Sequence, residues 1–332
     1  SVLYGIKPAV TAIVLFAAWH IGSRALKNNI LRAIDILAFV AIFVFDIAFP
    51  YIILMAGLLG YIGSRVAPEK FRVIAHHKES KDSYGPALID DDSPLPAHAN
   101  FKWMRLGTFI TTGLVIWGVV MVILIAHSGW HGTLTQMGWF FTKAVLVTFG
   151  GAYAVLPYVY QGGVAHFQWL TSSQMIDGLA LGETTPGPLI MIVTFVGFVG
   201  GWTKGFAGEI FGPEFLPMAA ILGASVATFF TFLPSFIFIL AGGPAVEATR
   251  HEVGFTAPLS GITAAVVGVI VNLALFFAYH VLWPEGFEGE FEWFSSMICV
   301  AAFVALVRYK IGIVPVVIGA AVMGTFYKFI II

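Results

Sequence analysis

Two acidic residues and two helix-breaking segments lie close together between Thr148 and Trp202, inside sequence that is otherwise apolar enough for a membrane. Acidic residues at membrane depth are costly, and they usually face a cavity, a charged partner or a proton path. We therefore assign proton or charge coupling to Asp177 and Glu183. Unpaired backbone groups are tolerated in a bilayer only beside protein or a water-filled cavity. Because transporters build substrate sites from broken helices, the pattern predicts a solute carrier.

The first break is rich in glycine and is followed by two tyrosines. Adjacent glycines lower helix stability by about 1 kcal/mol each and allow the chain to unwind, and tyrosine hydroxyls can donate hydrogen bonds to an oxyanion. Close helix packing is the alternative role of the glycines. The candidate binding residues at this break are Phe149, Gly150, Gly151, Tyr153, Pro157 and Tyr158.

The second break combines threonine, proline and glycine before an apolar run that starts at Leu189. Threonine before proline is suited to begin a helix, because the hydroxyl accepts from a free N–H and the ring fits the first turn. The N-terminus of the following helix would direct free N–H groups at this segment, which predicts an anion pocket. An ordinary capped loop at the membrane surface is the alternative. The candidate binding residues are Thr184, Thr185, Pro186, Gly187 and Pro188.

The segment between the two breaks is predicted to be helical. Thr171 and Gln174 have the spacing of a capping box, which starts a helix at the next residue and places Asp177 on it. An interfacial helix whose aspartate meets water is the alternative. Lys143, before the first break, either balances a bound anion, pairs with Asp177 or Glu183, or extends to the interface. We group Lys143 with the two acids as a coupling residue.

The composition identifies an all-α, polytopic membrane protein. Of the 332 residues, 59% are hydrophobic and 11% are charged, with a mean hydropathy of +0.91, whereas a soluble domain is about 25% charged. The net charge of −1 argues against a nucleic-acid partner. The sequence contains no zinc-protease or serine-hydrolase motif and no cluster of histidine or cysteine ligands, so we expect no enzyme, metal or cofactor.

The chain divides into three parts. Residues 1–66 are predicted to be the C-terminal part of a first membrane repeat, residues 67–104 a cytoplasmic linker, and residues 105–332 a second membrane repeat. The linker is rich in proline, charge and basic residues, and basic loops remain in the cytoplasm. Long apolar runs lie at 3–22, 105–127, 217–242 and 259–283. Short pairs or kinked helices lie at 31–49 and 50–64, 134–149 and 152–164, 171–182 and 186–203, and 293–308 and 311–331.

An internal repeat relates the start and the end of the chain. Residues 3–15 resemble residues 259–271, and each segment precedes a short helix pair that contains a proline, Pro50 or Pro315. Chance similarity between apolar helices is the alternative.

The flanks of the first pair are basic and Asp46 lies near its turn, whereas the segment before the second pair is acidic and its turn carries Arg308 and Lys310. Lys328, near the end of the second pair, departs from this pattern. The opposite charges predict opposite orientations and an inverted repeat. Lys7, in the first copy, is a further candidate for an anion path.

The motifs around both breaks resemble a known family. FGGAYAVLPYV at 149–159 and WLTSSQMIDGLALGETTPGPLIM at 169–191 are similar to the second-half signature of the chromate ion transporter family. LYGIKPAV at 3–10 and GPALIDD at 85–91 are similar to its long, two-domain members. The resemblance implies a secondary transporter, such as an antiporter, that exports chromate across the bacterial inner membrane and confers resistance. A sulfate or other oxyanion carrier or exchanger, and an anion channel, are the alternatives.

The resemblance also implies chromate as the partner, with sulfate as a competitor, in a lipid bilayer and as a possible homo-oligomer. Long members carry a glycine-type and a proline-type break in each half, but only one pair is present here. The sequence starts with Ser1 rather than methionine, so we expect residues to precede it. A half-deleted form of the protein is the alternative.

Overall fold

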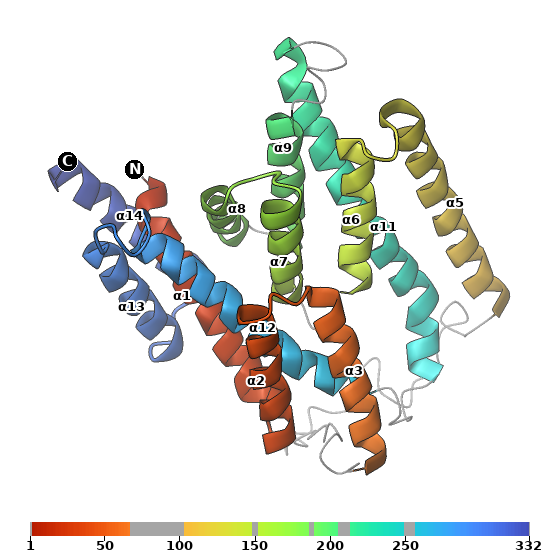
Figure 1. Ribbon diagram of the computed structural model, residues 1–332, viewed down its shortest axis with the longest axis horizontal. Coiled ribbons are helices and arrows are strands. Elements are labelled where there is room, and N and C mark those ends of the chain that lie inside the picture. The colour runs from red at the N-terminus through yellow and green to blue at the C-terminus, as the bar shows by residue number, and fades with distance from the viewer. Residues whose placement is uncertain are drawn as a thin grey trace, which may run out of the picture.

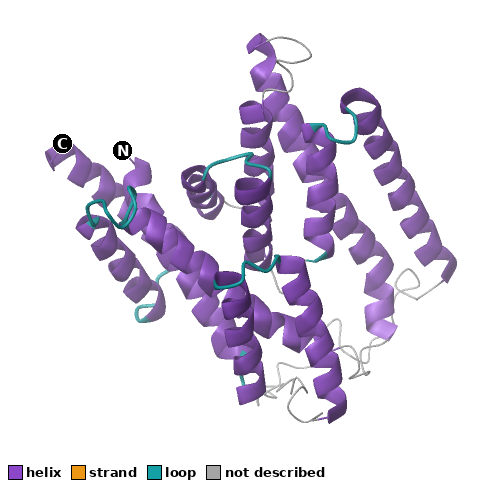
Figure 2. Ribbon diagram, in the orientation of Figure 1, coloured by secondary structure: helices purple, strands orange, loops and turns teal. Residues whose placement is uncertain are grey.

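The computed structural model describes residues 2–66, 103–147, 152–185, 189–204, 213–248 and 256–331. These residues form helices and connecting turns, and no strand occurs among them (Figure 2). Six of the helices in the described ranges are long and apolar enough to cross a membrane. The prediction of an all-α, polytopic membrane protein is therefore confirmed. The predicted linker lies outside the described residues except for Trp103 and Met104, which begin a helix.

The helices follow the predicted apolar segments closely. Their bounds are α1 Val2–Ala25, α2 Asn29–Phe43, α3 Phe49–Val66, α5 Trp103–Ser128, α6 Thr133–Leu146, α7 Ala152–Tyr160, α8 Ser172–Thr184, α9 Ile192–Lys204, α11 Leu216–Ala248, α12 Thr256–Leu282, α13 Trp293–Val307 and α14 Ile313–Ile331. A π-helical turn (Gln161–His166) continues α7, and 3₁₀ turns at Leu189–Met191 and Pro213–Phe215 precede α9 and α11.

The helices pack in two groups (Figure 1). One group contains α5, α6, α9 and α11, and the other contains α1 to α3 with α12 to α14. In the first group, a β-carbon on Gly201 or Gly223 would overlap backbone of the facing helix, so α9 and α11 approach closely. Helices α7 and α8 lie between the groups, because α7 contacts α12 and α6, and α8 contacts α1 and α9.

The two predicted helix pairs at the chain ends have the same local structure. Helices α2 and α13 have 15 residues each. Both turns place their third residue in the left-handed region, Asp46 at φ 49° and Lys310 at φ 53°. The next residue in each turn, Ile47 or Ile311, donates a backbone hydrogen bond of 3.1 Å to the preceding helix. The two helix pairs thus share the length of their first helix and the geometry of their turn, as an internal repeat predicts.

One predicted boundary is wrong. The sequence placed the first turn at Pro50, but the turn occupies residues 44–48, and Pro50 is the second residue of α3. Proline fits there because an N–H in the first helical turn has no intrahelical acceptor.

The two repeats exchange their helix pairs. Helices α2 and α3 pack on α12, whereas α13 and α14 pack on α1. Both contacts depend on a glycine in the long helix. A β-carbon on Gly5 would overlap the carbonyl of Ala320 in α14. A β-carbon on Gly261 would likewise overlap the carbonyl of Ala56 in α3. Each glycine therefore lets two helix backbones approach closely. The pair from one repeat is held by the long helix of the other.

The long helices α1 and α12 run in opposite directions. The hydroxyl of Tyr4, at the start of α1, donates to Glu292 over 2.5 Å. The N–H of Glu292 donates to the carbonyl of Leu282, at the end of α12. Gly22, near the end of α1, faces Val267 in the middle of α12. The repeats are therefore inverted relative to one another, as the charge pattern predicted.

Candidate functional site

The described flanks of the two helix breaks are neighbours in space. The residues Phe149, Gly150, Gly151, Pro186, Gly187 and Pro188 lie outside the described part of the chain. Their flanks are described, however, and they meet: the hydroxyl of Tyr153, in the first turn of α7, donates to Oε1 of Glu183 over 2.7 Å. Glu183 lies in the last turn of α8, directly before the second break. This hydrogen bond joins the chain after one break to the chain before the other.

Helix α8 carries the acidic residues and begins as predicted. The Thr171 hydroxyl accepts from the N–H of Gln174 over 3.2 Å, and Oε1 of Gln174 accepts from the N–H of Thr171 over 2.8 Å. This reciprocal capping box satisfies two free donors and fixes the first turn. The apolar face of α8, including Met175 and Leu179, is buried. The prediction that a capping box starts the helix after Thr171 is confirmed.

The charged partner of Asp177 comes from α1. The ammonium of Lys7 lies 3.1 Å from Oδ1 of Asp177, and it donates to the hydroxyl of Ser173 over 2.8 Å. The two charged side chains are 28% and 23% exposed, so the pair is largely removed from solvent. Because α1 belongs to the first repeat, the pair ties α8 to the other half of the chain. Sequence reasoning identified both residues as intramembrane charges but did not pair them.

Lys143 occupies a different environment from the acids of α8. Its side chain is exposed on α6, and its ammonium lies 5.7 Å from the centroid of the Trp139 ring. This is a cation–π contact, which stabilises an ammonium without a carboxylate. In this structure the partner of Asp177 is Lys7 and that of Glu183 is Tyr153. The predicted pairing of Lys143 with either acid is therefore not present in the structure.

A polar cavity of about 370 Å³ opens beside Lys7. Helices α1, α8, α12 and α13 line it with Tyr4, Lys7, Ser173, His280, Glu292 and Ser295, together with four apolar residues. The ammonium of Lys7 and the hydroxyl groups can bind an anion, while the carboxylate of Glu292, which accepts from Tyr4, opposes it. An anion bound in this cavity would therefore be attracted by the ammonium of Lys7 and repelled by the carboxylate of Glu292.

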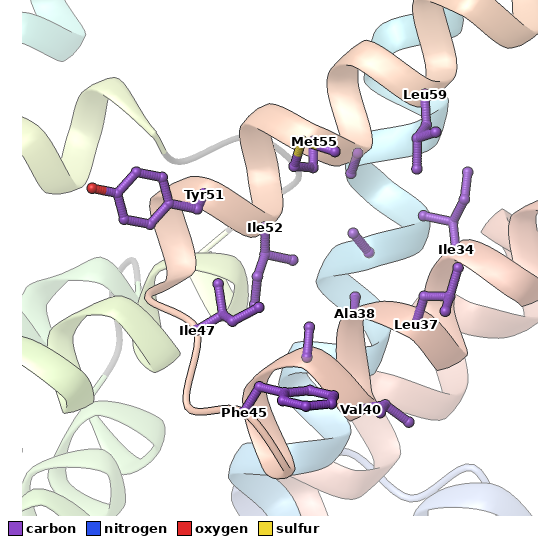
Figure 3. Close-up of a pocket in the computed structure, with 13 residues that line it drawn as sticks. Ile34, Leu37, Ala38, Val40, Phe45, Ile47, Tyr51, Ile52, Met55 and Leu59 are labelled. Atoms are coloured by element: carbon purple, nitrogen blue, oxygen red, sulfur yellow. The ribbon is translucent and has the colours of Figure 1, made fainter.

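A larger cavity, of about 460 Å³, has the opposite character. It is a groove between α2 and α3, with Ala265 of α12 at its base. Figure 3 shows hydrocarbon or thioether side chains around it, and the hydroxyl of Tyr51 points away. A dianion would lose its hydration there without gaining a partner. The groove is therefore unsuited to a charged solute.

One candidate residue, Thr185, has a local role that differs from the predicted one. The hydroxyl of Thr185 donates to the carbonyl of Leu181 over 2.6 Å, at the end of α8. Thr185 therefore ends helix α8. The prediction that it starts the following helix is corrected, because α9 begins only at Ile192, after a 3₁₀ turn. The side chain of Thr184 lies outside the described residues.

The remaining candidates, Pro157 and Tyr158, are buried in α7. Proline within a helix has no N–H for the carbonyl four residues earlier, which here belongs to Tyr153. The ring of Tyr158 stacks on Phe140, with centroids 4.7 Å apart, and lies 6.1 Å from Phe49 of α3. These aromatic contacts fix α7 against α6 and α3.

Comparison with known proteins agrees with these features. Residues 135–325 match the chromate transporter family. The chain belongs to the chromate transporter family. The matched region includes both breaks, α8 and most of the second repeat, so the resemblance inferred from the sequence motifs is confirmed.

Two relatives in the chromate transporter family match nearly the whole chain. One is a chromate transport protein of Cupriavidus metallidurans, 25% identical over 98% of this chain and 66% of that protein. The other is a chromate transport protein of Pseudomonas aeruginosa, 30% identical over 96% of this chain and 65% of that protein. A probable chromate transport protein of Synechococcus elongatus is 29% identical over 52% of this chain and 38% of its own length. The chain thus spans just under two thirds of the first two relatives. No solved structure gives a significant match.

Proposed function

We propose that this protein is a carrier for chromate, with the two helix breaks as its binding site. The observation that carries the proposal is the Tyr153–Glu183 hydrogen bond, which brings the flanks of both breaks together in a member of the chromate transporter family. Chromate is a tetrahedral dianion, which needs several donors to replace its hydration shell. Glycine-rich backbone and a helix N-terminus supply such donors without a mobile side chain.

The binding residues in this proposal are those of the two breaks. Gly150 and Gly151 allow the chain to unwind, so that N–H groups can point at the anion. Gly187 permits close backbone approach on the opposite side, and the 3₁₀ turn at Leu189–Met191 that leads into α9 directs further N–H groups there. Tyr153 and Glu183 position the two segments relative to one another.

In this proposal, the Lys7–Asp177 pair couples binding of the anion to movement of the helices. A dianion that approaches Lys7 competes with the Asp177 carboxylate for one ammonium. If the anion displaces Asp177, then α8 is released from α1, and the two repeats can move relative to each other. Inverted repeats of this kind support alternating access in secondary transporters.

We propose further that transport is secondary and directed outward across the bacterial inner membrane, which would confer chromate resistance. The relatives that share nearly the whole chain are named as chromate transport proteins. Sulfate has the same charge and shape as chromate, so it is expected to compete for the site. We assign no enzymatic reaction to the protein.

Uptake of chromate into inverted membrane vesicles tests the proposal. Vesicles that contain the full-length protein are expected to accumulate chromate with saturable kinetics, and excess sulfate is expected to slow the uptake. Counterflow against internal chromate distinguishes a carrier from a channel, because a channel does not exchange bound solutes. The variants Asp177→Asn and Glu183→Gln are expected to reduce the flux. Full flux in both variants would contradict the proposed site.

A further inference from the structure

We propose that Asp35 of α2 is the residue that binds and releases the coupling proton in the transport cycle. This inference rests on the proposed carrier function. It replaces Asp177 and Glu183 as proton carriers and leaves them the roles of positioning and charge balance. The argument uses the surroundings of the three carboxylates.

Asp35 differs from the other two acids because its side chain forms no ion pair or hydrogen bond with the described residues. Oδ1 of Asp35 is buried and accepts no hydrogen bond from any residue that the structure describes. Asp177 has the ammonium of Lys7, and Glu183 has the hydroxyl of Tyr153. Partners of this kind stabilise the ionised carboxylate, whereas an isolated carboxyl in apolar surroundings is less costly when it is neutral. Among the described contacts, Asp35 thus lacks the compensating group that each of the other two acids has.

Asp35 is partly buried, and the side of its carboxyl that carries Oδ1 packs closely against α12. A β-carbon on Gly268 of α12 would lie 3.0 Å from Oδ1 of Asp35 and would overlap the backbone carbonyl of the same residue. The absence of a side chain at Gly268 thus creates the space in which the carboxyl lies. Its neighbour Ile34 is part of the buried core. Water does not reach this oxygen in the present conformation.

The titratable groups on the surrounding helices lie away from this position. On α12 they are Tyr279 and His280, roughly three helical turns beyond Gly268. On α3 they are Tyr51, Tyr61 and Arg65, and Arg65 donates to the hydroxyl of Tyr61. On α2 itself, Arg32 lies one turn earlier and is exposed. None of these groups forms an ion pair or a hydrogen bond with Asp35 among the described contacts.

The internal repeat shows that the fold does not need an acid here. Helices α2 and α13 occupy equivalent places, and the position in α13 that corresponds to Asp35 holds Cys299. Cys299 packs against the hydrophobic core as a small apolar side chain. The packing of this helix type on the long helix of the other repeat is thus satisfied by an apolar residue. The carboxyl of Asp35 therefore requires a reason other than stability.

The position of Asp35 allows proton binding to affect the substrate site. Helix α12 contacts both α2 and α7. The ring of Phe276 in α12 lies 4.4 Å, centroid to centroid, from the ring of Tyr160 at the end of α7. If α2 shifts on α12 in the alternate conformation, the carboxyl of Asp35 reaches water and releases its proton. Uptake of the next proton requires a second conformation in which the carboxyl faces water on the other side of the membrane, so that each cycle moves one proton across it.

The test separates exchange from proton-driven transport in proteoliposomes with the full-length protein. Counterflow of chromate needs no net proton movement, whereas accumulation driven by a pH gradient does. Asp35→Asn is expected to retain counterflow at the wild-type rate and to lose gradient-driven accumulation. Asp35→Glu, which restores the acid, is expected to recover accumulation. Asp46→Asn is the matched control, because it removes an exposed acid of the same repeat in a turn.

The outcomes are distinct. Accumulation that persists in Asp35→Asn would overturn the assignment, and so would loss of both activities in a variant that melts and elutes like the wild type. Absence of counterflow in the wild-type protein would instead refute the carrier function. Labelling of the wild-type protein by a hydrophobic carbodiimide gives a second test that needs no variant, because this reagent attacks protonated carboxyls in apolar surroundings. Mass spectrometry is expected to find Asp35 labelled ahead of Asp177 and Glu183, and the reverse order would refute the proposal.

Discussion

Lys7 and Asp177 each compensate the free energy that burial of the other's charge would require. Their charged atoms lie 3.1 Å apart between α1 and α8, and both side chains are mostly shielded from solvent. A single charge left alone in such a place costs more than the pair contributes, because the desolvated charge remains without compensation. The same reasoning applies to Glu183, whose carboxylate accepts from Tyr153.

The pair predicts a specific pattern in a double-mutant cycle. Lys7→Met and Asp177→Asn should each destabilise the protein by about 1–2 kcal/mol, between the values for exposed and buried pairs. The combined variant should be less destabilised than the sum of the two, because neither charge is left alone. Thermal unfolding in detergent measures all three. Strict additivity would show that the pair has no energetic coupling.

Tyr153→Phe tests the contact between the two breaks. Loss of a hydrogen bond to a charged group, worth about 1.4 kcal/mol, should lower initial chromate flux by about tenfold. Tyr51→Phe is the control, since its hydroxyl points out of the apolar groove and is far from the breaks in sequence (Figure 3). Equal flux in the two variants would argue against a positioning role for Tyr153.

At the scale of elements, small residues decide where the helix pairs lie. Gly5 and Gly261 occupy equivalent places in α1 and α12, and each faces backbone in the last helix of the other repeat. A side chain at either position would force two backbones apart. In a membrane this close approach matters more than apolarity, because lipid tails are as apolar as the side chains they replace.

Alanine substitutions in this interface therefore have different expected effects. Gly5→Ala should lower stability by about 1–3 kcal/mol, because the new methyl group overlaps the carbonyl of Ala320. Gly319→Ala, in the facing helix α14, has open space around it and should be neutral or stabilising by up to about 1 kcal/mol. Melting temperatures of the two variants measure the difference. Equal melting temperatures would refute the close packing of α1 on α14.

At the scale of the whole molecule, two inverted repeats hold each other's helix pairs. The reciprocal packing makes α1 and α12 the shared centre of one group of helices, and α7 and α8 connect this group to the other (Figure 1). A shift of α8 relative to α1 would thus change the geometry of both breaks. The arrangement fits a carrier whose halves move relative to one another around a fixed site.

The inverted arrangement predicts opposite accessibility of equivalent turns. Val44 and Arg308 cap α2 and α13 at corresponding positions, and both are exposed. In a protein with Cys299 replaced by alanine, Val44→Cys and Arg308→Cys should react with an impermeant thiol reagent from opposite sides of the membrane. Right-side-out and inverted vesicles distinguish the sides. Labelling of both from one side would rule out the inverted topology.

Much of the architecture could be predicted from local sequence. The apolar runs gave the spans, the Thr171 capping box gave the start of α8, and the similarity of residues 3–15 to 259–271 gave the repeat. These signals depend on composition and on interactions within a few residues along the chain. The prediction placed the first turn at Pro50, but the turn lies at residues 44–48, because proline is compatible with the second position of a helix.

The amino-acid sequence by itself determined that this is an all-α membrane protein with broken helices, a repeat and intramembrane acids. Only the tertiary structure decided which charges meet. Lys7 of α1 reaches Asp177 of α8, although the two residues are far apart in the chain. Asp35 of α2 has no such partner among the described residues. A charge in an apolar run shows that a partner or a proton is needed. Which of the two it has depends on packing between helices, and local sequence does not encode that.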